Sequence, residues 1–230
     1  MKKILLLHGA LGCKEDMKEL SAELKELGYN AHSLDFSGHG KKKLPEHFSI
    51  HLLANDVVEY LRNHEIEKIH IFGYTLGGYV GMYLAKYFPH LVDSLITLGT
   101  KFRWNPQAAS EFIETIRPET IKKNKKLYEQ LIKKHGKKVD QLIEKLIEFY
   151  QSMGTEAPLH LEEYLAIECE TLILRGENDT WVTEEECLNV KDHILHSQYQ
   201  VLSKTPRDWD KVNKKKLAKI IADFINNQNI

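Results

Sequence analysis

Hydrophobic and polar positions follow two alternating spacings along the chain. Short apolar runs predict strands, and the first, fourth and fifth lack polar alternation, as expected where both faces of a sheet are covered. Between the runs, apolar residues three or four positions apart predict helices; in the first helix, Gly28 stands where a C-terminal glycine belongs. This order predicts an α/β fold with a doubly wound, mostly parallel sheet of about six strands. The runs are 3–7, 30–34, 69–72, 94–98, 171–174 and 199–202.

The spacing between the fourth and fifth runs breaks this pattern. About seventy residues separate them, far more than the connections of about 2–6 residues typical of α/β units. Residues 111–150 are rich in Lys, Glu, Ile and Leu and have helical periodicity. The sequence therefore predicts a helical cap over 102–165, inserted into a core made of 1–101 and 166–230.

Charge excludes some partners. The chain has 32 Lys and Arg against 33 Asp and Glu, so its formal charge of -1 gives no global attraction to nucleic acid or to an anionic membrane. Lysines are dense in the insertion, and a solvated helix face is favoured over a site for an anionic ligand, lipid surface or partner. No nucleic-acid-binding signature accompanies them, so no nucleic-acid partner is expected. These lysines are at positions 122, 123, 125, 126, 133, 134, 137 and 138.

The cysteines and the first residues bear on location. Cys13, Cys169 and Cys187 form an odd set without metal-ligand spacing, which predicts neither a disulfide framework nor a metal site. The apolar run 4–7 is shorter than the roughly 7–15 residues of a signal-peptide core, and no run approaches the ~20 needed to span a bilayer. We expect a cytoplasmic protein with no membrane span; the oligomeric state stays open.

One segment combines a strand, a tight turn and a helix. In Gly73-Tyr74-Thr75-Leu76-Gly77-Gly78, the glycines let a helix begin directly against the end of the strand. This arrangement raises Thr75 above the sheet at a helix N-terminus, which suits a nucleophile. The same glycines imitate a dinucleotide-binding turn, but the G-x-G-x-x-G fingerprint follows none of the predicted strands. No cofactor is therefore expected.

This segment resembles the G-x-S-x-G nucleophile elbow of the α/β-hydrolase superfamily, with Thr75 where serine is expected. Three further segments resemble that family in the same order along nearly the whole chain. They are the oxyanion loop His8-Gly9-Ala10-Leu11-Gly12, the D-x-x-G-x-G loop from Asp35 to Gly40, and the acid strand from Leu172 to Asp179. The resemblance implies a triad acid at Asp179 and an oxyanion hole formed by the N–H groups of Ala10 and Leu76.

The family's triad histidine is replaced. It normally follows the last strand by about five residues, and Arg207 stands there, with no histidine after His196. A guanidinium with a pKa above about 12 cannot accept a nucleophile's proton, although it can bind an anion. Thr75 also departs from the pattern, because a β-branched residue is strained at the positive φ of an elbow. His39 and His160 are the nearest candidates for a substitute base, and a structural role is favoured for both.

Two hypotheses follow for the function. In the first, the protein is a hydrolase of small esters or related carbonyl substrates, with Thr75 attacking and Asp179 as the acid. In the second, it is an inactive member that binds a small molecule or a partner, with Asp179 and Arg207 forming an ion pair. The sequence leaves open whether it is an enzyme. Candidate substrate-binding residues are Leu11, Tyr74, Trp104 and Tyr150; Cys13 is interpreted as a small buried residue.

Overall fold

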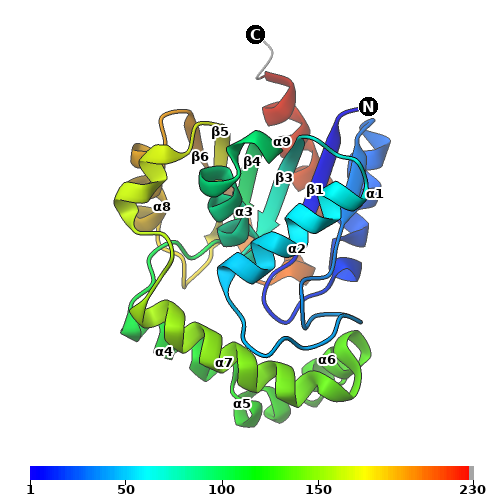
Figure 1. Ribbon diagram of the computed structural model, residues 1–230, viewed down its shortest axis with the longest axis vertical. Helices are drawn as coiled ribbons and strands as arrows, with labels where there is room; N and C mark the ends of the chain where they lie inside the picture. The colour runs from blue at the N-terminus through cyan, green and yellow to red at the C-terminus, as the bar shows by residue number, and fades with distance from the viewer. Residues whose placement is uncertain (228–230) are drawn as a thin grey trace.

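The computed structural model describes residues 1–227 and contains a six-stranded parallel sheet (Figure 1). The strand order is β2-β1-β3-β4-β5-β6, and every neighbouring pair is parallel. Each predicted apolar run coincides with a strand to within one residue, and the predicted fold class is confirmed. The strands are β1 (Lys3–Leu7), β2 (Asn30–Ser33), β3 (Ile69–Tyr74), β4 (Val92–Leu98), β5 (Glu170–Asn178) and β6 (Ser197–Pro206).

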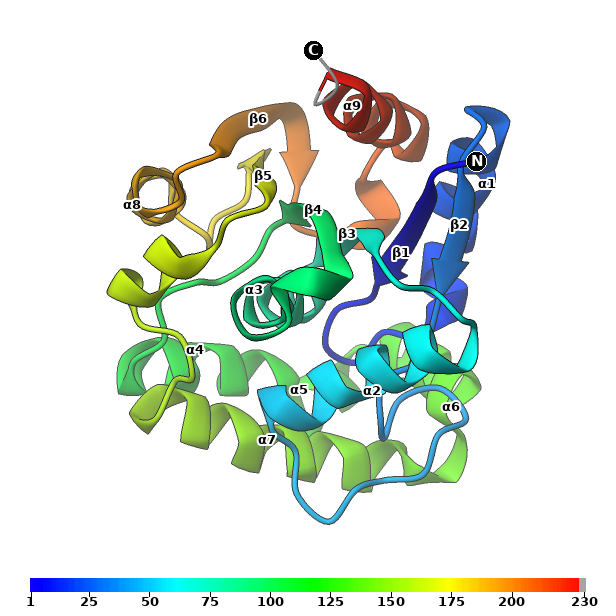
Figure 2. The same cartoon turned by 45° about the horizontal axis from the view of Figure 1, so that its top comes forward.

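Helices cover both faces of the sheet (Figure 2). Alternate residues of β1 point to opposite faces: Ile4 and Leu6 pack in a cluster with α1 (Lys18–Glu26) and α9 (Lys214–Asn227). Leu5 and Leu7 pack in a second cluster on the other face. All four side chains are fully buried, which explains why this strand reads as a continuous apolar run. The second face is covered by α2 (Ile50–Asn63), α3 (Leu76–Tyr87) and α8 (Glu184–His193).

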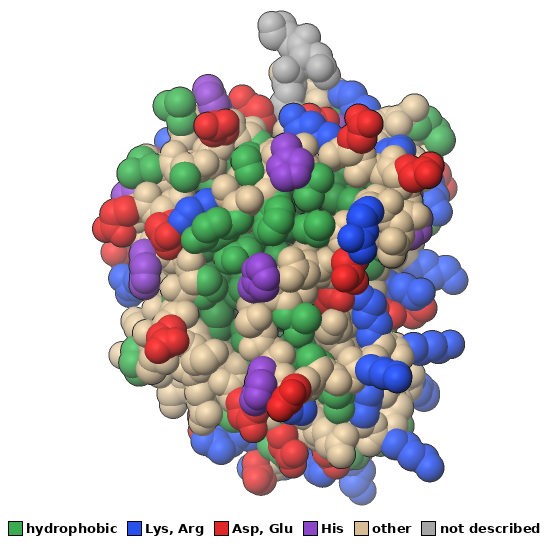
Figure 3. Space-filling view, in the orientation of Figure 1, with side chains coloured by type: hydrophobic (Ala, Val, Ile, Leu, Met, Phe, Trp, Pro, Cys, Tyr) green, Lys and Arg blue, Asp and Glu red, His purple; other side chains and the backbone are tan. Residues whose placement is uncertain are grey.

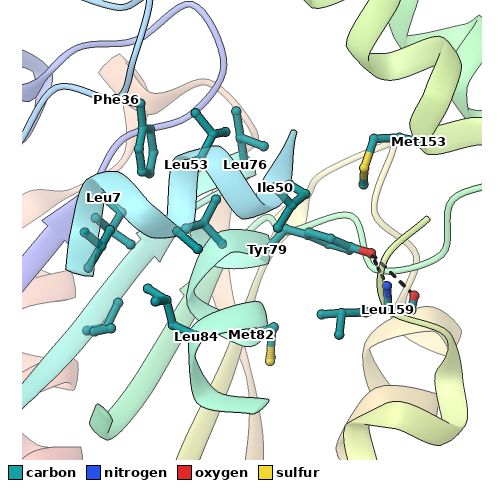
Figure 4. Packing of buried hydrophobic residues seen from close by; sticks show 14 of the residues in the cluster. Leu7, Phe36, Ile50, Leu53, Leu76, Tyr79, Met82, Leu84, Met153 and Leu159 are labelled. Carbon is teal, nitrogen blue, oxygen red and sulfur yellow. Dashed lines mark hydrogen bonds between the residues drawn. The ribbon is translucent and has the colours of Figure 1, made fainter. Parts of the chain in front are cut away.

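Tyr79 of α3 joins the second cluster to the chain that follows the inserted helices (Figure 4). Its ring is buried beside Met153, and its hydroxyl lies against Leu159. The hydroxyl accepts a hydrogen bond from the Leu159 N–H at 3.2 Å and donates to its carbonyl at 3.4 Å. Burial raises the pKa of Tyr79, so the hydroxyl stays protonated as a donor.

The insertion consists of helices that lie beyond the carboxyl ends of the strands (Figure 1). Asn105 caps the first of them by accepting a hydrogen bond from the Ala108 N–H at 2.8 Å, and Pro106 occupies the first helical position. Asn124 caps the third in the same way, accepting from Leu127 at 3.1 Å. The helices are α4 (Pro106–Ile116), α5 (Pro118–Lys123), α6 (Lys125–His135) and α7 (Val139–Thr155).

The lysines of the insertion are mostly solvated. Figure 3 shows basic side chains at the lower right of this face, where Figure 1 places α6, and apolar side chains over its middle. Lys134 and Lys138 are the half-buried members: Lys134 pairs with Asp16 at 2.8 Å, and Lys138 donates to the Lys42 carbonyl. These two side chains fasten the end of α6 and the turn after it to the core. No helix within residues 1–227 has the length and apolar character needed to cross a membrane.

Candidate functional site

Thr75 stands at the sharp turn between β3 and α3. Its backbone has φ 49° and ψ -109°, a conformation that costs a β-branched residue about 1–3 kcal/mol. Two hydrogen bonds hold the turn: the Thr75 N–H donates to the Leu98 carbonyl at 2.9 Å, and the Thr100 hydroxyl donates to the Thr75 carbonyl at 3.2 Å. The surrounding strands thus fix the strained residue that the sequence predicted.

Glycines allow α3 to begin against the ends of the strands. A Cβ on Gly73 would lie 2.4 Å from the backbone of Gly77, and a Cβ on Gly77 would lie 2.4 Å from the Leu7 carbonyl oxygen. Both contacts are with backbone atoms, which cannot move aside as a flexible side chain can. The glycines therefore serve the contact between helix and strand, and they bring Leu76 close to the end of β1.

The loop after β1 lies against the Thr75 side chain. A Cβ on Gly9 would lie 2.3 Å from Thr75 Oγ1, so only glycine allows this approach. The N–H groups of Ala10 and Leu76 donate to no acceptor within residues 1–227. Leu11 has φ 56°, another constrained position in this loop. Two free backbone donors thus belong to the segments that meet at Thr75.

In the described part of the chain, no histidine lies beside the Thr75 hydroxyl. Within residues 1–227, Thr75 Oγ1 forms no hydrogen bond, and no histidine lines the two spaces that Thr75 borders. His39 is fully buried, 5.1 Å from His8 between ring centres, and its Nδ1 hydrogen-bonds to the Ser37 carbonyl at 3.0 Å. His160 is exposed and lines a separate cavity beside α8. Neither candidate histidine lies where it would accept the Thr75 proton.

Arg207 occupies the place expected for the triad histidine. Its guanidinium carbon lies 4.1 Å from the centre of a Trp181 ring and 5.6 Å from that of Phe112. The Tyr74 hydroxyl donates to the Arg207 carbonyl, which holds this loop beside the turn that carries Thr75. Burial lowers the pKa of Arg207, and the negative charge of Asp179 opposes this shift. The guanidinium stays charged at neutral pH.

The expected ion pair between Asp179 and Arg207 is not formed. Asp179 Oδ1 accepts hydrogen bonds from the N–H groups of Trp181 at 2.9 Å and Val182 at 3.0 Å. Its Oδ2 is buried and has no hydrogen-bond partner within residues 1–227. Arg207 stacks on Trp181 instead of reaching the carboxylate. One oxygen of Asp179 therefore shapes the loop that carries Trp181, which is the physical reason the predicted pair is absent.

Thr75 and Arg207 together border a small cavity and a larger groove. The cavity has a volume of about 20 Å³, room for about one water molecule. The groove has a volume of about 700 Å³ and runs between the loop after β1, the segment 207–211 and helices α4–α6. A molecule larger than water therefore reaches Thr75 and Arg207 from the groove.

A comparison with protein families identifies the fold by sequence. The family model described as alpha/beta hydrolase fold matches residues 2–125, more than half of the chain. The chain belongs to the α/β-hydrolase family. Curated relatives of this hydrolase-fold chain include a probable alcohol acetyltransferase of Wickerhamomyces anomalus, 23% identical over 98% of the chain and 79% of that protein. Ethanol acetyltransferase 1 of Kluyveromyces lactis is 30% identical over 52% of the chain, but over only 32% of its own length.

Solved structures share the same fold. A thermophilic esterase from Thermogutta terrifontis superposes with a TM-score of 0.79 at 20% identity, covering 99% of this chain and 90% of the esterase. The enol-lactonase from Burkholderia xenovorans superposes with a TM-score of 0.76 at 16% identity, covering 98% and 91%. These likenesses cover both the sheet and the inserted helices of this hydrolase-fold chain.

The predicted binding residues line the two spaces that Thr75 borders, together with residues that were not predicted. Of the predicted binding residues, Trp104 and Tyr150 line the cavity, while Leu11 and Tyr74 line the groove. Trp181 was missed, although it stands two residues after Asp179 in a loop that the family resemblance places beside the site. Other missed residues that line the cavity are Tyr79, Lys101, Phe112 and Met153.

Proposed function

We propose that this α/β-hydrolase-fold protein binds a small molecule above the Thr75 turn and does not turn it over efficiently. The observation that carries this proposal is that Arg207, the residue expected at the histidine position, borders the cavity beside Thr75, while the Thr75 hydroxyl has no hydrogen-bond acceptor within residues 1–227. The groove gives a ligand access, and helices α4–α6 of the insertion act as the cap above it. Leu11, Tyr74, Trp104 and Tyr150 are the proposed ligand contacts.

The missing base has a large chemical cost. A positioned general base accelerates proton transfer by about 10²–10⁴-fold, and a threonine hydroxyl without one is a weak nucleophile at neutral pH. An oxyanion hole and binding alone retain roughly 10³–10⁴-fold acceleration over water when triad members are removed. The free N–H groups of Ala10 and Leu76 are the donors for that residual effect. Any remaining hydrolysis is therefore slow.

A second candidate function is ester hydrolysis or acyl transfer by Thr75. The positive φ of Thr75 favours it, because this strained turn presents the side chain as an elbow presents a nucleophile. The names of the relatives, alcohol acetyltransferase and esterase, point to the same acyl chemistry. In this candidate, Asp179 is the acid and Ala10 and Leu76 supply the oxyanion hole, but a base must still be supplied.

Steady-state hydrolysis of p-nitrophenyl acetate and p-nitrophenyl octanoate separates the two functions. The wild type is compared with Thr75→Ala, and Thr115→Ala serves as a matched control because Thr115 lines the same groove. Binding without turnover predicts equal, slow rates in all three proteins. A wild-type rate that Thr75→Ala abolishes and Thr115→Ala retains would establish Thr75 as a nucleophile and overturn the binding proposal.

A further inference from the structure

Arg207 is a cation without an acceptor in the protein. Within residues 1–227, its guanidinium forms no ion pair with a carboxylate and donates no hydrogen bond. A guanidinium carries five N–H donors, and the Arg207 side chain is half-buried, so these donors are accessible from outside the protein. The side chain borders both the cavity and the groove beside Thr75. Its donors are therefore available to a molecule that enters the groove.

The aromatic neighbours of Arg207 determine which of its groups are available to bind that molecule. The guanidinium carbon lies 4.1 Å from the centre of a Trp181 ring and 5.6 Å from that of Phe112, so it is the Trp181 ring that contacts the planar group. Contact with a ring face leaves the N–H groups in the guanidinium plane free to point sideways. Such a fork matches the two oxygens of a carboxylate and forms paired, charge-assisted hydrogen bonds.

Three other cations around the site are paired within the protein, whereas the exposed Lys126 lines the groove but not the cavity. Lys101 lines the cavity, but it pairs with the buried Glu186 at 2.6 Å. In the groove, Lys134 pairs with Asp16 at 2.8 Å and Lys211 pairs with Asp208 at 2.8 Å. Arg207 is the cation that borders both spaces together with Thr75. An anion that approaches Thr75 therefore comes into contact with the Arg207 guanidinium.

The groove also offers an apolar wall to the rest of the ligand. This wall comes from α4, α5 and α6 and lies opposite the loop after β1. Burying a methylene group against such a wall is worth about 0.8 kcal/mol, so an apolar chain extending from the anionic head strengthens binding. Its residues include Phe112, Ile116, Ile121, Leu127 and Leu131.

From these contacts we propose that Arg207 anchors the carboxylate of a straight-chain carboxylic acid whose acyl chain lies in the groove. The inference rests on the proposed binding function and names its ligand class. The carboxylate receives the guanidinium fork at the level of Thr75, and the acyl chain runs along α4–α6. Substitution of the triad histidine by arginine thereby replaces proton transfer with recognition of a carboxylate.

Isothermal titration of the purified protein with sodium octanoate tests the ligand class, with 1-octanol and inorganic phosphate as comparison ligands. Octanoate should bind at least about tenfold more tightly than octanol, which has the same chain without the charge. It should also bind more tightly than phosphate, which has charge without a chain. The intrinsic fluorescence of Trp181 should change with octanoate, because the ligand meets the guanidinium that this ring contacts.

Variants then assign the contact to Arg207. Arg207→Met should weaken octanoate binding about tenfold or more, and Arg207→Lys should also weaken it because the fork is lost. Lys211→Met removes a paired cation from the same groove and should change the affinity less than threefold. Circular dichroism and urea unfolding of each variant establish that it is folded, so a lost contact is distinguished from a lost structure.

The outcomes separate this inference from the function on which it rests. Equal affinity for octanoate and octanol, or unchanged octanoate affinity in folded Arg207→Met, overturns the carboxylate anchor while leaving a binding role intact. Phosphate binding as tight as octanoate binding overturns the acyl-chain assignment. Absence of octanoate binding at millimolar concentration also overturns the inference. The proposed binding function is tested by a separate experiment: ester hydrolysis that depends on Thr75 would overturn it.

Discussion

The turn that carries Thr75 and the loops that carry Asp179 and Arg207 differ in what they retain of the family pattern. At the turn, the backbone is family-like: φ is positive at Thr75, and glycines bring α3 onto the strands. In the two loops, the side chains have taken other contacts. Asp179 Oδ1 binds the N–H groups of its own loop, and Arg207 stacks on Trp181.

This difference separates the two parts of a hydrolase site. Backbone donors and a strained turn are built into the meeting of β1, β3 and α3, so the fold itself maintains them. Proton transfer depends on side chains at the ends of two loops, where single substitutions remove it without disturbing the sheet. A family member can therefore lose turnover while it keeps the geometry that receives a carbonyl or carboxylate oxygen.

The largest expected effect comes from restoring the side chains of the family pattern at positions 75 and 207. Thr75→Ser combined with Arg207→His supplies an unbranched nucleophile and a candidate base, and Asp179 has an unpartnered Oδ2 that can accept from the imidazole. We expect kcat/KM for p-nitrophenyl acetate to rise by about 10²–10⁴-fold, or about 3–5 kcal/mol of transition-state stabilisation. Steady-state kinetics of the double variant measures this gain.

The two single variants are the controls for this restoration. Thr75→Ser alone lacks a base, and Arg207→His alone retains the methyl group of Thr75, so each should gain less than the pair. A folded double variant with the wild-type rate would show that restoring the two side chains is not sufficient for catalysis. The free donors at Ala10 and Leu76 would then not act as an oxyanion hole.

The turn itself should tolerate almost no change of backbone shape. In Gly77→Ala, the new Cβ meets the Leu7 carbonyl oxygen at 2.4 Å, so α3 must move away from β1. We expect the free energy of unfolding to fall by about 3 kcal/mol, measured by urea denaturation. Gly28→Ala is the matched control: this glycine has φ 86° and open space around it, so only the backbone cost of about 1 kcal/mol remains. Equal losses in both variants would contradict the close contact.

The two regions should also respond differently to acid. His8 in the loop after β1 is fully buried, and burial lowers its pKa to about 4. The unfolded chain therefore binds more protons than the folded one below pH 6.5. The free energy of unfolding should be constant above that pH and fall as the pH drops, with His8 contributing about 2 kcal/mol of the loss at pH 5. Urea unfolding between pH 8 and 5 measures the slope.

Substitutions test how much of the change in unfolding free energy with pH comes from His8. His8→Gln lowers stability at pH 8, because His8 Nε2 accepts from the Phe36 N–H at 3.2 Å, and it should reduce the slope without abolishing it, because burial also lowers the pKa of His39. The exposed His196→Gln should leave the curve unchanged. A wild-type free energy that stays constant down to pH 5 would show that His8 titrates normally in the folded protein. Arg207 has no titration in this range, so its loop adds nothing to the slope.

Sequence patterns predicted what depends on local spacing. The apolar runs located all six strands, and the glycines around Thr75 located the turn. Both patterns can be recognised because each involves only a few consecutive residues. The stacking of Arg207 on Trp181 was not predicted, since it joins residues of two separate loops. His135 shows the same limit: it bonds the Gly40 N–H and the Leu11 carbonyl from α6, about one hundred residues away. Such contacts depend on the orientation of side chains that meet only after folding.

The smallest effect tests whether Asp179 now has a structural role. Asp179→Ala leaves the N–H groups of Trp181 and Val182 without their acceptor, and we expect a loss of about 1–2 kcal/mol in urea unfolding together with altered tryptophan fluorescence. Asp179→Asn keeps one acceptor oxygen and should retain most of that stability. Asp208→Ala, which removes an exposed carboxylate paired with Lys211, should cost less than about 0.5 kcal/mol. If Asp179→Ala is as stable as the wild type, other contacts hold the loop that presents Trp181 to Arg207. Arg207 would then be the one loop residue shown to have taken a different contact from the family pattern.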